Sequence, residues 1–256
     1  MIFDTHAHYD DEQFDIDREE LIEAVRASGV DHVVDVGASL ESTAKALELA
    51  HKYDFIYAAV GVHPSEVEEL DEDNLELLRE WSTDSKCVAI GEIGLDYHWP
   101  DPSPDLQKKW FRRQLKLARD ERLPVIIHSR DAAADTLEVL KSEHAEEIGG
   151  VVHCFSYSKE VAKTCVDMGF YIGVGGVVTF KNGKKLKEVV EQTPIEKILL
   201  ETDCPYLSPE PYRGKRNSSL NLPYVIEAIA AIKGMEKDEV IRETSKNAKR
   251  MYDLLK

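Results

Sequence analysis

The sequence predicts a (β/α)₈ barrel, the TIM-barrel class of α/β fold, with residues 1–256 forming one domain. Short runs rich in β-branched residues alternate with charged, amphipathic segments along the whole chain. The length of 256 residues is close to the roughly 250 residues usual for this fold. No low-complexity linker and no change in composition divides the chain, so we expect a single unit.

The strand candidates are apolar runs bounded by turn residues or by the start of an amphipathic segment. The first, MIFDTHAH, begins at the first residue. Each run is followed by a segment with helical character, as a (β/α)₈ barrel requires. The expected strands cover residues 1–8, 32–37, 55–62, 87–94, 124–130, 150–155, 170–176 and 197–203.

The helix candidates show apolar residues at helical spacing between charged ones. In the first of them Leu21, Ile22 and Val25 recur on one face before Gly29 ends the segment. The acidic segment 66–81 is expected to be a helix with a solvated face. The expected helices cover residues 17–28, 40–52, 66–81, 104–121, 133–144, 159–168, 184–192, 222–234 and 237–256.

An open, doubly wound parallel sheet is the alternative arrangement of such alternating elements. A dinucleotide-binding sheet of that kind would be expected to show GxGxxG after an early strand. The nearest candidate, GVGG at 173–176, comes late in the chain and does not match. The barrel is therefore preferred, and its active site would lie at the C-terminal ends of the strands.

The composition limits the class of protein. The net charge of −17 argues against a passive nucleic-acid coating protein, because such proteins are usually basic. No apolar run is long enough to span a membrane, and no basic-then-apolar leader begins the chain. The four cysteines form no CxxC pair, which fits free thiols in a reducing cytoplasm. We expect a cytoplasmic monomer or small homo-oligomer.

Histidines and carboxylates fall at the ends of predicted strands. His6 and His8 lie on the same face of the first strand, since side chains alternate along a strand. Imidazole nitrogens and carboxylate oxygens suit zinc, manganese, nickel or iron, and magnesium less readily. Six ligands are too many for one catalytic ion, so the sequence predicts two divalent ions sharing a carboxylate. The expected ligands are His6, His8, Glu92, His128, His153 and Asp203.

The ordered motifs HAH, GVHP, GEIGLDY, HSRDA, HCFS, TFKN and ETDCPYLSPEPYRGKRN resemble the TatD family of metal-dependent deoxyribonucleases, within the amidohydrolase superfamily. The resemblance runs from residue 4 to about residue 217 and implies the same six metal ligands. The chain departs from the family pattern in two places. Tyr157 stands where glycine is common, and Ser218 and Ser219 stand where an acidic residue and proline are common. Both departures bear on substrate preference.

The two carboxylates among these ligands have different expected roles. Glu92 would bridge the ions. A carbamylated lysine, used elsewhere in the superfamily, is disfavoured because the nearby Lys86 lies at the wrong end of the strand. Asp203 would be both a ligand and the general base that takes a proton from a metal-activated water. Glu201 either supports Asp203 or pairs with a buried arginine or lysine.

Other residues near the strand ends have weaker assignments. By strand alternation Cys154 and Cys204 point away from the site and are expected to be small core residues. Tyr97, His98 and Trp99 would form either a stacking surface for a base or a structural lid. Four residues are expected to meet phosphate: His63, Arg130, Lys181 and Arg213.

The leading hypothesis is a divalent-metal-dependent deoxyribonuclease that hydrolyses DNA at ends or in single strands. The metal chemistry follows from the residues, whereas DNA as the substrate follows from the resemblance. A second hypothesis keeps the metal-dependent hydrolase and replaces DNA by a small amide, lactone or phosphoester. A third is a metal-binding scaffold without activity, which the complete set of ligand types argues against.

Overall fold

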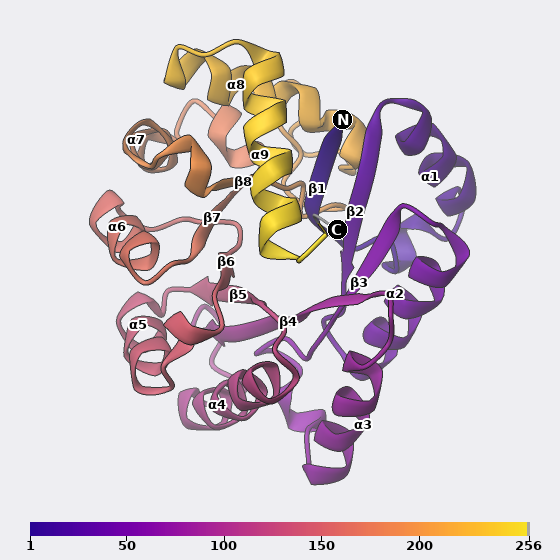
Figure 1. Ribbon diagram of the computed structural model, residues 1–256, viewed down its shortest axis with the longest axis vertical. Helices are drawn as coiled ribbons and strands as arrows, with labels where there is room; N and C mark the ends of the chain where they lie inside the picture. The colour runs from indigo at the N-terminus through magenta and orange to yellow at the C-terminus, as the bar shows by residue number, and fades with distance from the viewer. Residues whose placement is uncertain (255–256) are drawn as a thin grey trace.

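The computed structural model describes residues 1–254, and eight parallel strands form its centre. They pair in chain order, from β1 to β8, which gives the barrel that the sequence predicts rather than the open sheet with a changed strand order (Figure 1). The strands are β1 (Ile2–Ala7), β2 (Val30–Val36), β3 (Ile56–Val60), β4 (Cys87–Asp96), β5 (Val125–Arg130), β6 (Gly150–Val152), β7 (Tyr171–Val174) and β8 (Ile198–Leu200).

Helices alternate with the strands and surround them (Figure 1). Several begin where capping residues predict. Ser103 accepts the N–H of Leu106 at the start of α4, and Pro104 occupies the first turn. The helices are α1 (Arg18–Ala27), α2 (Leu40–Lys52), α3 (Glu72–Ser82), α4 (Pro104–Glu121), α5 (Ala133–Ser142), α6 (Lys159–Asp167), α7 (Lys184–Gln192), α8 (Leu222–Lys233) and α9 (Lys237–Met251).

The interior of the barrel is filled by apolar side chains from every strand, including Phe3, Val34 and Leu199. Ala248, Met251 and Tyr252, at the end of α9, belong to the same buried cluster. The Tyr252 hydroxyl also donates to the carbonyl of Thr5 at 3.0 Å. Helix α9 therefore closes the barrel at the starts of the strands, and in Figure 1 it crosses in front of β8 and β1. The opposite end is left open for a site.

A polar network closes the barrel between β8 and β1. The buried Asp4 carboxylate accepts the Thr202 hydroxyl at 2.7 Å and the Ser219 hydroxyl at 2.6 Å. Beyond these residues the backbones join, because Asp203 N–H donates to His6 O at 2.9 Å and His8 N–H to Cys204 O at 2.8 Å. Burial raises the pKa of Asp4 to about 6, against the opposing effect of these hydrogen bonds. Ser219, one of the unusual residues, thus supports barrel closure.

The predicted elements differ from the observed ones mainly at their ends. The expected strands at 150–155 and 197–203 are shorter, because β6 ends at Val152 and β8 at Leu200. The expected helix 66–81 is divided into a 3₁₀ turn and α3, since Asp71 caps α3 by accepting the N–H of Asn74. The last helix ends at Met251 rather than at residue 256, and residues 255–256 lie outside the described chain.

No helix within residues 1–254 has both the length and the apolar character needed to cross a bilayer.

Candidate metal centre

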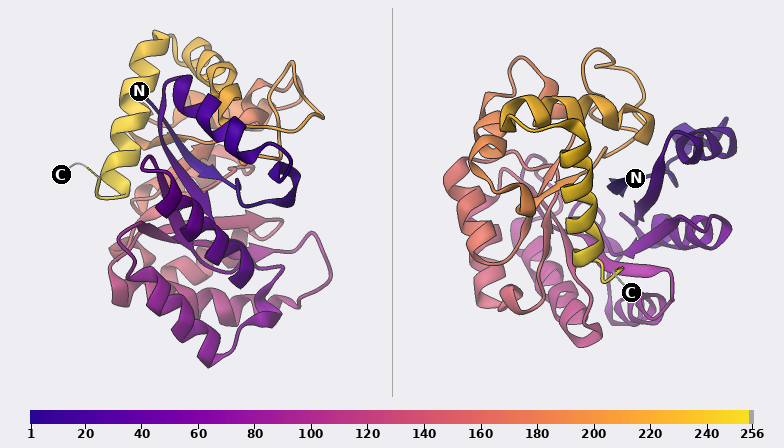
Figure 2. Two further views of the ribbon diagram at one scale, coloured as in Figure 1. Left: turned by 90° about the vertical axis from the view of Figure 1, so that its right-hand side faces the viewer. Right: turned by 45° about the horizontal axis from the view of Figure 1, so that its top comes forward.

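A cavity of about 830 Å³ opens at the C-terminal ends of the strands. The loops that follow β4 and β8 project on this side, away from α9, in the left view of Figure 2. The wall of the cavity includes five of the six expected ligands. The sixth, His6, is buried and does not line the cavity. The wall ligands are His8, Glu92, His128, His153 and Asp203. Side chains far apart in sequence therefore meet where a barrel places its active site.

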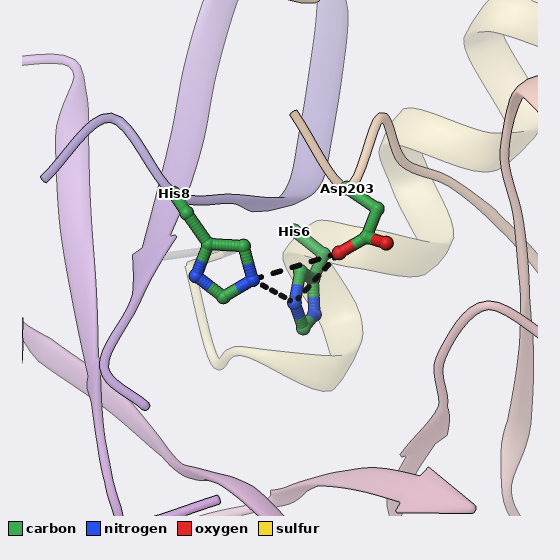
Figure 3. Close-up of side chains that lie close together, drawn as sticks. All are labelled: His6, His8 and Asp203. Carbon is green, nitrogen blue, oxygen red and sulfur yellow. Dashed lines mark hydrogen bonds and ion pairs between the residues drawn. The ribbon is translucent and has the colours of Figure 1, made fainter. Parts of the chain in front are cut away.

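His6, His8 and Asp203 form the first group of ligand atoms (Figure 3). The Nε2 atoms of the two imidazoles lie 3.0 Å apart. Asp203 Oδ1 lies 3.7 Å from His6 Nε2 and 3.5 Å from His8 Nε2. Asp203 turns toward them because its backbone, just past β8, has φ of 56°, in the left-handed region. The three side chains come from both sides of the β8–β1 closure.

The tautomer of His8 is fixed by the backbone. Its Nδ1 lies 2.8 Å from the carbonyl oxygen of Val36, and a carbonyl can only accept. Nδ1 must therefore carry a proton, which leaves the Nε2 lone pair of the neutral ring facing His6 and Asp203. Such a hydrogen bond through the second ring nitrogen commonly orients histidines that bind metals.

Glu92 lies between two sets of imidazoles. Its Oε2 is 3.4 Å from His6 Nε2 and 3.7 Å from His8 Nε2. Its Oε1 is 2.6 Å from His128 Nδ1 and 2.5 Å from His153 Nε2. Each carboxylate oxygen thus faces a different pair of rings. The side chain is buried, so the contacts are shielded from water.

Gly94, two residues after Glu92, is required by the packing of β4 on β5. At Gly94 φ is 148°, and an added Cβ would lie 1.9 Å from the carbonyl oxygen of His128. Only glycine permits so close an approach in this backbone conformation. The GEIG motif therefore brings the strand carrying Glu92 against the strand that carries His128.

Asp96 belongs to the site, although our sequence interpretation gave it no role. Its Oδ2 lies 3.2 Å from His128 Nε2, the ring nitrogen on the far side from Glu92. The signal was present in the sequence, because Glu92, Gly94 and Asp96 alternate on one face of β4. The carboxylate holds the orientation of the His128 ring.

His63 lies closer to the centre than expected from its turn position. Its Nε2 is 3.8 Å from Glu92 Oε1, and its ring packs edge-on against His128 at 4.3 Å. The backbone N–H of Ser65 donates to Nδ1 at 3.1 Å, so the ring proton is assigned to Nε2. Burial and the neighbouring His128 lower the pKa of His63 to about 3. His63, Glu92 and His128 offer ligand atoms within 4.8 Å of one another, so the neutral ring lies where it can donate a hydrogen bond or coordinate an ion.

Glu201 has a different partner from those we considered. Its Oε1 accepts the N–H of Cys154 at 2.5 Å, and no described arginine or lysine pairs with it. His6, His153 and Glu201 offer ligand atoms within 4.8 Å of one another, and the rings of His6 and His153 stack at 4.0 Å. Glu201 therefore holds the backbone just after His153.

The cysteine prediction is half right. Cys204 is fully buried, as expected for a small core residue. Cys154 instead lines the cavity. Strand alternation fails here because β6 has already ended at Val152 and Cys154 has φ of 43°.

The protonation pattern follows from two carboxylates buried among imidazoles. Burial disfavours the charged form of Glu92, but His153 and His128 outweigh it and hold the pKa of Glu92 well below its usual range. Burial likewise opposes charge on His8 and His128, yet hydrogen bonds to carboxylates raise their pKa values to about 10 and about 9. The pKa of His6 differs, because burial and the charge of His153 lower it to about 4.

These residues fit divalent ions. Two donors about 2.1 Å from one ion, at bond angles of about 90–109°, lie about 3.0–3.4 Å apart. The Nε2 atoms of His6 and His8, at 3.0 Å, meet this condition. The distance of 3.3 Å between His128 Nδ1 and His153 Nε2 meets it as well. Nitrogen and carboxylate donors in this mixture suit zinc, manganese, nickel or iron.

The four residues expected to meet phosphate divide into two pairs. His63 and Arg130 line the cavity. Lys181 and Arg213 are exposed but lie outside the residues of its wall. The guanidinium of Arg213 stacks on Phe180 at 4.3 Å, next to Lys181. The structure therefore brings only one of the predicted arginines and lysines, Arg130, to the mouth.

Tyr157 joins two loops at this mouth. Its hydroxyl oxygen accepts the N–H of Ala132 at 3.0 Å and lies 2.9 Å from Ser129 Oγ. Ala132 is the N-cap residue of α5, and no side chain caps this helix. The unusual tyrosine thus ties the loop after β6 to the turn that follows Arg130, a contact that glycine could not make.

We expect Tyr157→Phe to destabilise the fold by about 1–3 kcal/mol, the range for leaving a buried polar group without a partner. The N–H at risk is that of Ala132, which is only 3% exposed. Urea unfolding of the metal-free protein measures the effect, with Tyr212→Phe at an exposed tyrosine as the control. Equal midpoints for the two variants would show that this hydroxyl contributes nothing.

Known proteins share both the sequence and the fold of this chain. Residues 3–253 match the family described as TatD related DNase. The metal-dependent hydrolase YabD of Bacillus subtilis is 49% identical over 252 residues, which cover 98% of this chain and 99% of that protein. The 3'-5' ssDNA/RNA exonuclease TatD of Cronobacter sakazakii is 33% identical, covering 98% of this chain and 97% of its own.

The structural comparison agrees. The crystal structure of YJJV, a TatD homologue from Escherichia coli K12, superposes with a TM-score of 0.93 at 33% identity and covers 98% of each chain. The matches in sequence and in structure both extend over nearly the whole barrel. The chain therefore belongs to the TatD family of metal-dependent hydrolases, enzymes that act on ester bonds.

Proposed function

We propose that this enzyme is a deoxyribonuclease that hydrolyses phosphodiester bonds of DNA at ends or in single strands, with two divalent ions. The observation that carries the proposal is the division of the imidazoles by Glu92. Oε2 faces His6 and His8, whereas Oε1 faces His128 and His153. A carboxylate with one oxygen toward each pair suits a site that holds two ions side by side, as in two-metal phosphoryl transfer.

We assign the ligands accordingly. His6, His8 and Asp203 would hold the first ion, because their donor atoms lie within 4.8 Å of one another. His128 and His153 would hold the second, and Glu92 would bridge both. The distance of 3.3 Å between His128 Nδ1 and His153 Nε2 supports the second assignment. When bound, the ions would supply the Lewis acidity that lowers the pKa of water and balances charge on phosphate.

The protein's own groups would carry the remaining steps. Asp203 is placed to accept the proton of the attacking water, because its Oδ1 lies beside His6 and His8, which would hold the first ion. Its carboxylate is ionised and free to accept, since hydrogen bonding to His8 and the charges of His153 and His6 outweigh burial and lower its pKa. His63 would donate its Nε2–H to a phosphate oxygen. Arg130, at the mouth of the cavity, would bind a phosphate next to the one that is hydrolysed.

DNA is favoured over a small substrate by the relatives and by the mouth of the cavity. The family is described as DNases, and one relative is named an exonuclease for single-stranded DNA and RNA. The Arg130 side chain has no ion-pair partner within residues 1–254, so it is available to a substrate anion. We further propose a cytoplasmic enzyme, in keeping with its four free cysteines.

Removal of metal provides the test. We expect chelation to abolish hydrolysis of an end-labelled single-stranded oligonucleotide, and added manganese, zinc, nickel, iron or magnesium to restore it. Each ion at about 100 times its Kd should also stabilise the fold by about 2.7 kcal/mol, measured as a higher melting temperature. The proposal would be overturned if metal-loaded protein opened a lactone or cleaved an amide but left DNA intact.

A further inference from the structure

Three aromatic residues in succession follow β4 at the edge of the cavity, and two of them are already engaged. The Tyr97 hydroxyl donates to Asp135 at 2.8 Å, and its ring packs against the core. The His98 ring lies 3.5 Å from a carboxylate oxygen of Asp131. These contacts identify Tyr97 and His98 as parts of the loop structure.

Trp99 differs from both. Its side chain lines the cavity and is 59% exposed. Its one ring contact is with His98, edge-on at 4.8 Å and 84°. Within residues 1–254 nothing hydrogen-bonds to its indole, and the other tryptophans, Trp81 and Trp110, are half-buried and buried. A large apolar ring at a cavity mouth, contacted by another ring at its edge alone within residues 1–254, is available to a ligand.

A cation without an ion-pair partner in residues 1–254, Arg130, ends the neighbouring strand β5. Strands β4 and β5 pair with Asp96 opposite Arg130, and Tyr97 N–H donates to Arg130 O at 2.9 Å. Trp99 follows two residues later, and both side chains line the same cavity. An aromatic face next to a guanidinium matches a strand in which bases alternate with phosphates.

We propose that Trp99 stacks on an unpaired nucleobase while Arg130 binds an adjacent phosphate, so that the site takes single-stranded or frayed ends without sequence preference. This inference rests on the proposed function and specifies its substrate. A base within a duplex is stacked on both faces and would have to leave the helix to reach the ring. Tyr206, across the cavity, is a weaker candidate because its hydroxyl donates to Asp11 at 2.8 Å.

Intrinsic fluorescence tests the stacking without catalysis. Metal-free protein in chelator is titrated with a thymidine hexanucleotide while tryptophan emission is recorded. We expect quenching in the wild type and none in Trp99→Phe, which keeps an aromatic ring but removes the exposed indole. Quenching that persists in Trp99→Phe, or its absence in the wild type, would contradict the inference.

Kinetics with added metal supply the second readout. Trp99→Ala should raise KM for single-stranded DNA by about 5- to 150-fold, the range for losing one base–aromatic stack, while Trp99→Phe stays near wild type. Tyr212→Ala, at an aromatic residue 37% exposed outside the cavity, is the matched control and should leave KM unchanged. Replacing the terminal nucleotide by an abasic tetrahydrofuran residue should weaken the wild type, but not Trp99→Ala.

The outcomes separate the two proposals. Wild-type protein that cleaves no oligonucleotide with any metal overturns the nuclease function, and the stacking role with it. Wild-type protein that cleaves DNA while Trp99→Ala keeps an unchanged KM overturns the stacking role alone. Melting temperatures of all variants check folding, which an exposed loop substitution should not disturb.

Discussion

Glu92→Gln should lower kcat by at least about a thousandfold, beyond the roughly 10–100-fold typical of losing a group that only supports a metal ligand. Glutamine keeps the size of the side chain but offers one neutral carbonyl oxygen in place of two charged ones. Glutamine therefore cannot place one carboxylate oxygen beside His6 and His8 and a second beside His128 and His153. Elemental analysis should show fewer than two ions per chain.

The same substitution at Glu66 is the matched control. Glu66 is exposed in the loop after β3 and does not line the cavity. Glu66→Gln should keep metal content and kcat. If Glu92→Gln retained two ions and full activity, the bridging assignment would be wrong; if it failed to melt cooperatively, the loss would be one of folding.

The metal-free form of Glu92→Gln should also differ in its response to pH. In the wild type His128 has a pKa raised to about 9 by Asp96 and Glu92, in spite of burial. A raised histidine pKa stabilises the fold fully below about 6.5, and the stabilisation is lost as pH rises toward 9. Without the Glu92 charge this decline between pH 6.5 and 9 should be smaller in thermal melts.

The alternation of elements made the barrel predictable, and local signals set most helix ends. Helix α4 begins and ends where Ser103, Pro104 and the amphipathic pattern place it. The strands near the site were less predictable. Beyond Val152 and Leu200 the chain leaves regular pairing, because His153 and Asp203 must turn inward toward the other donors. Because apolar residues continue beyond Val152 and Leu200, a prediction from sequence makes these two strands too long.

The meeting of candidate ligands at one end of the barrel was predictable where residue type and strand position agree, as for His6, His8 and His128. Contacts between separate loops could not be predicted from the sequence. Nothing in the sequence shows that Tyr157 reaches Ala132, or that Arg213 folds onto Phe180 rather than into the cavity. These placements depend on how irregular segments pack, and no periodicity encodes that packing.

The second large effect is expected at Asp203. Asp203→Asn should lower kcat by about 10²- to 10⁴-fold, the range for losing a positioned proton acceptor. The backbone should be unaffected, because asparagine tolerates the positive φ of 56° as well as aspartate does. An amide oxygen can still contact an ion, and His6, His8 and Glu92 remain. Metal content should therefore stay near that of the wild type while turnover falls.

Asp131→Asn is the matched control, since Asp131 also has a positive φ, 54°, just after a strand, and does not line the cavity. It should keep both metal content and kcat. The comparison separates the two roles proposed for Asp203. Loss of metal together with activity would make Asp203 a ligand alone, and a kcat within about tenfold of wild type would assign the proton to another group, since one acceptor contributes about a hundredfold or more. Full metal with slow turnover is the result that a proton-accepting carboxylate requires.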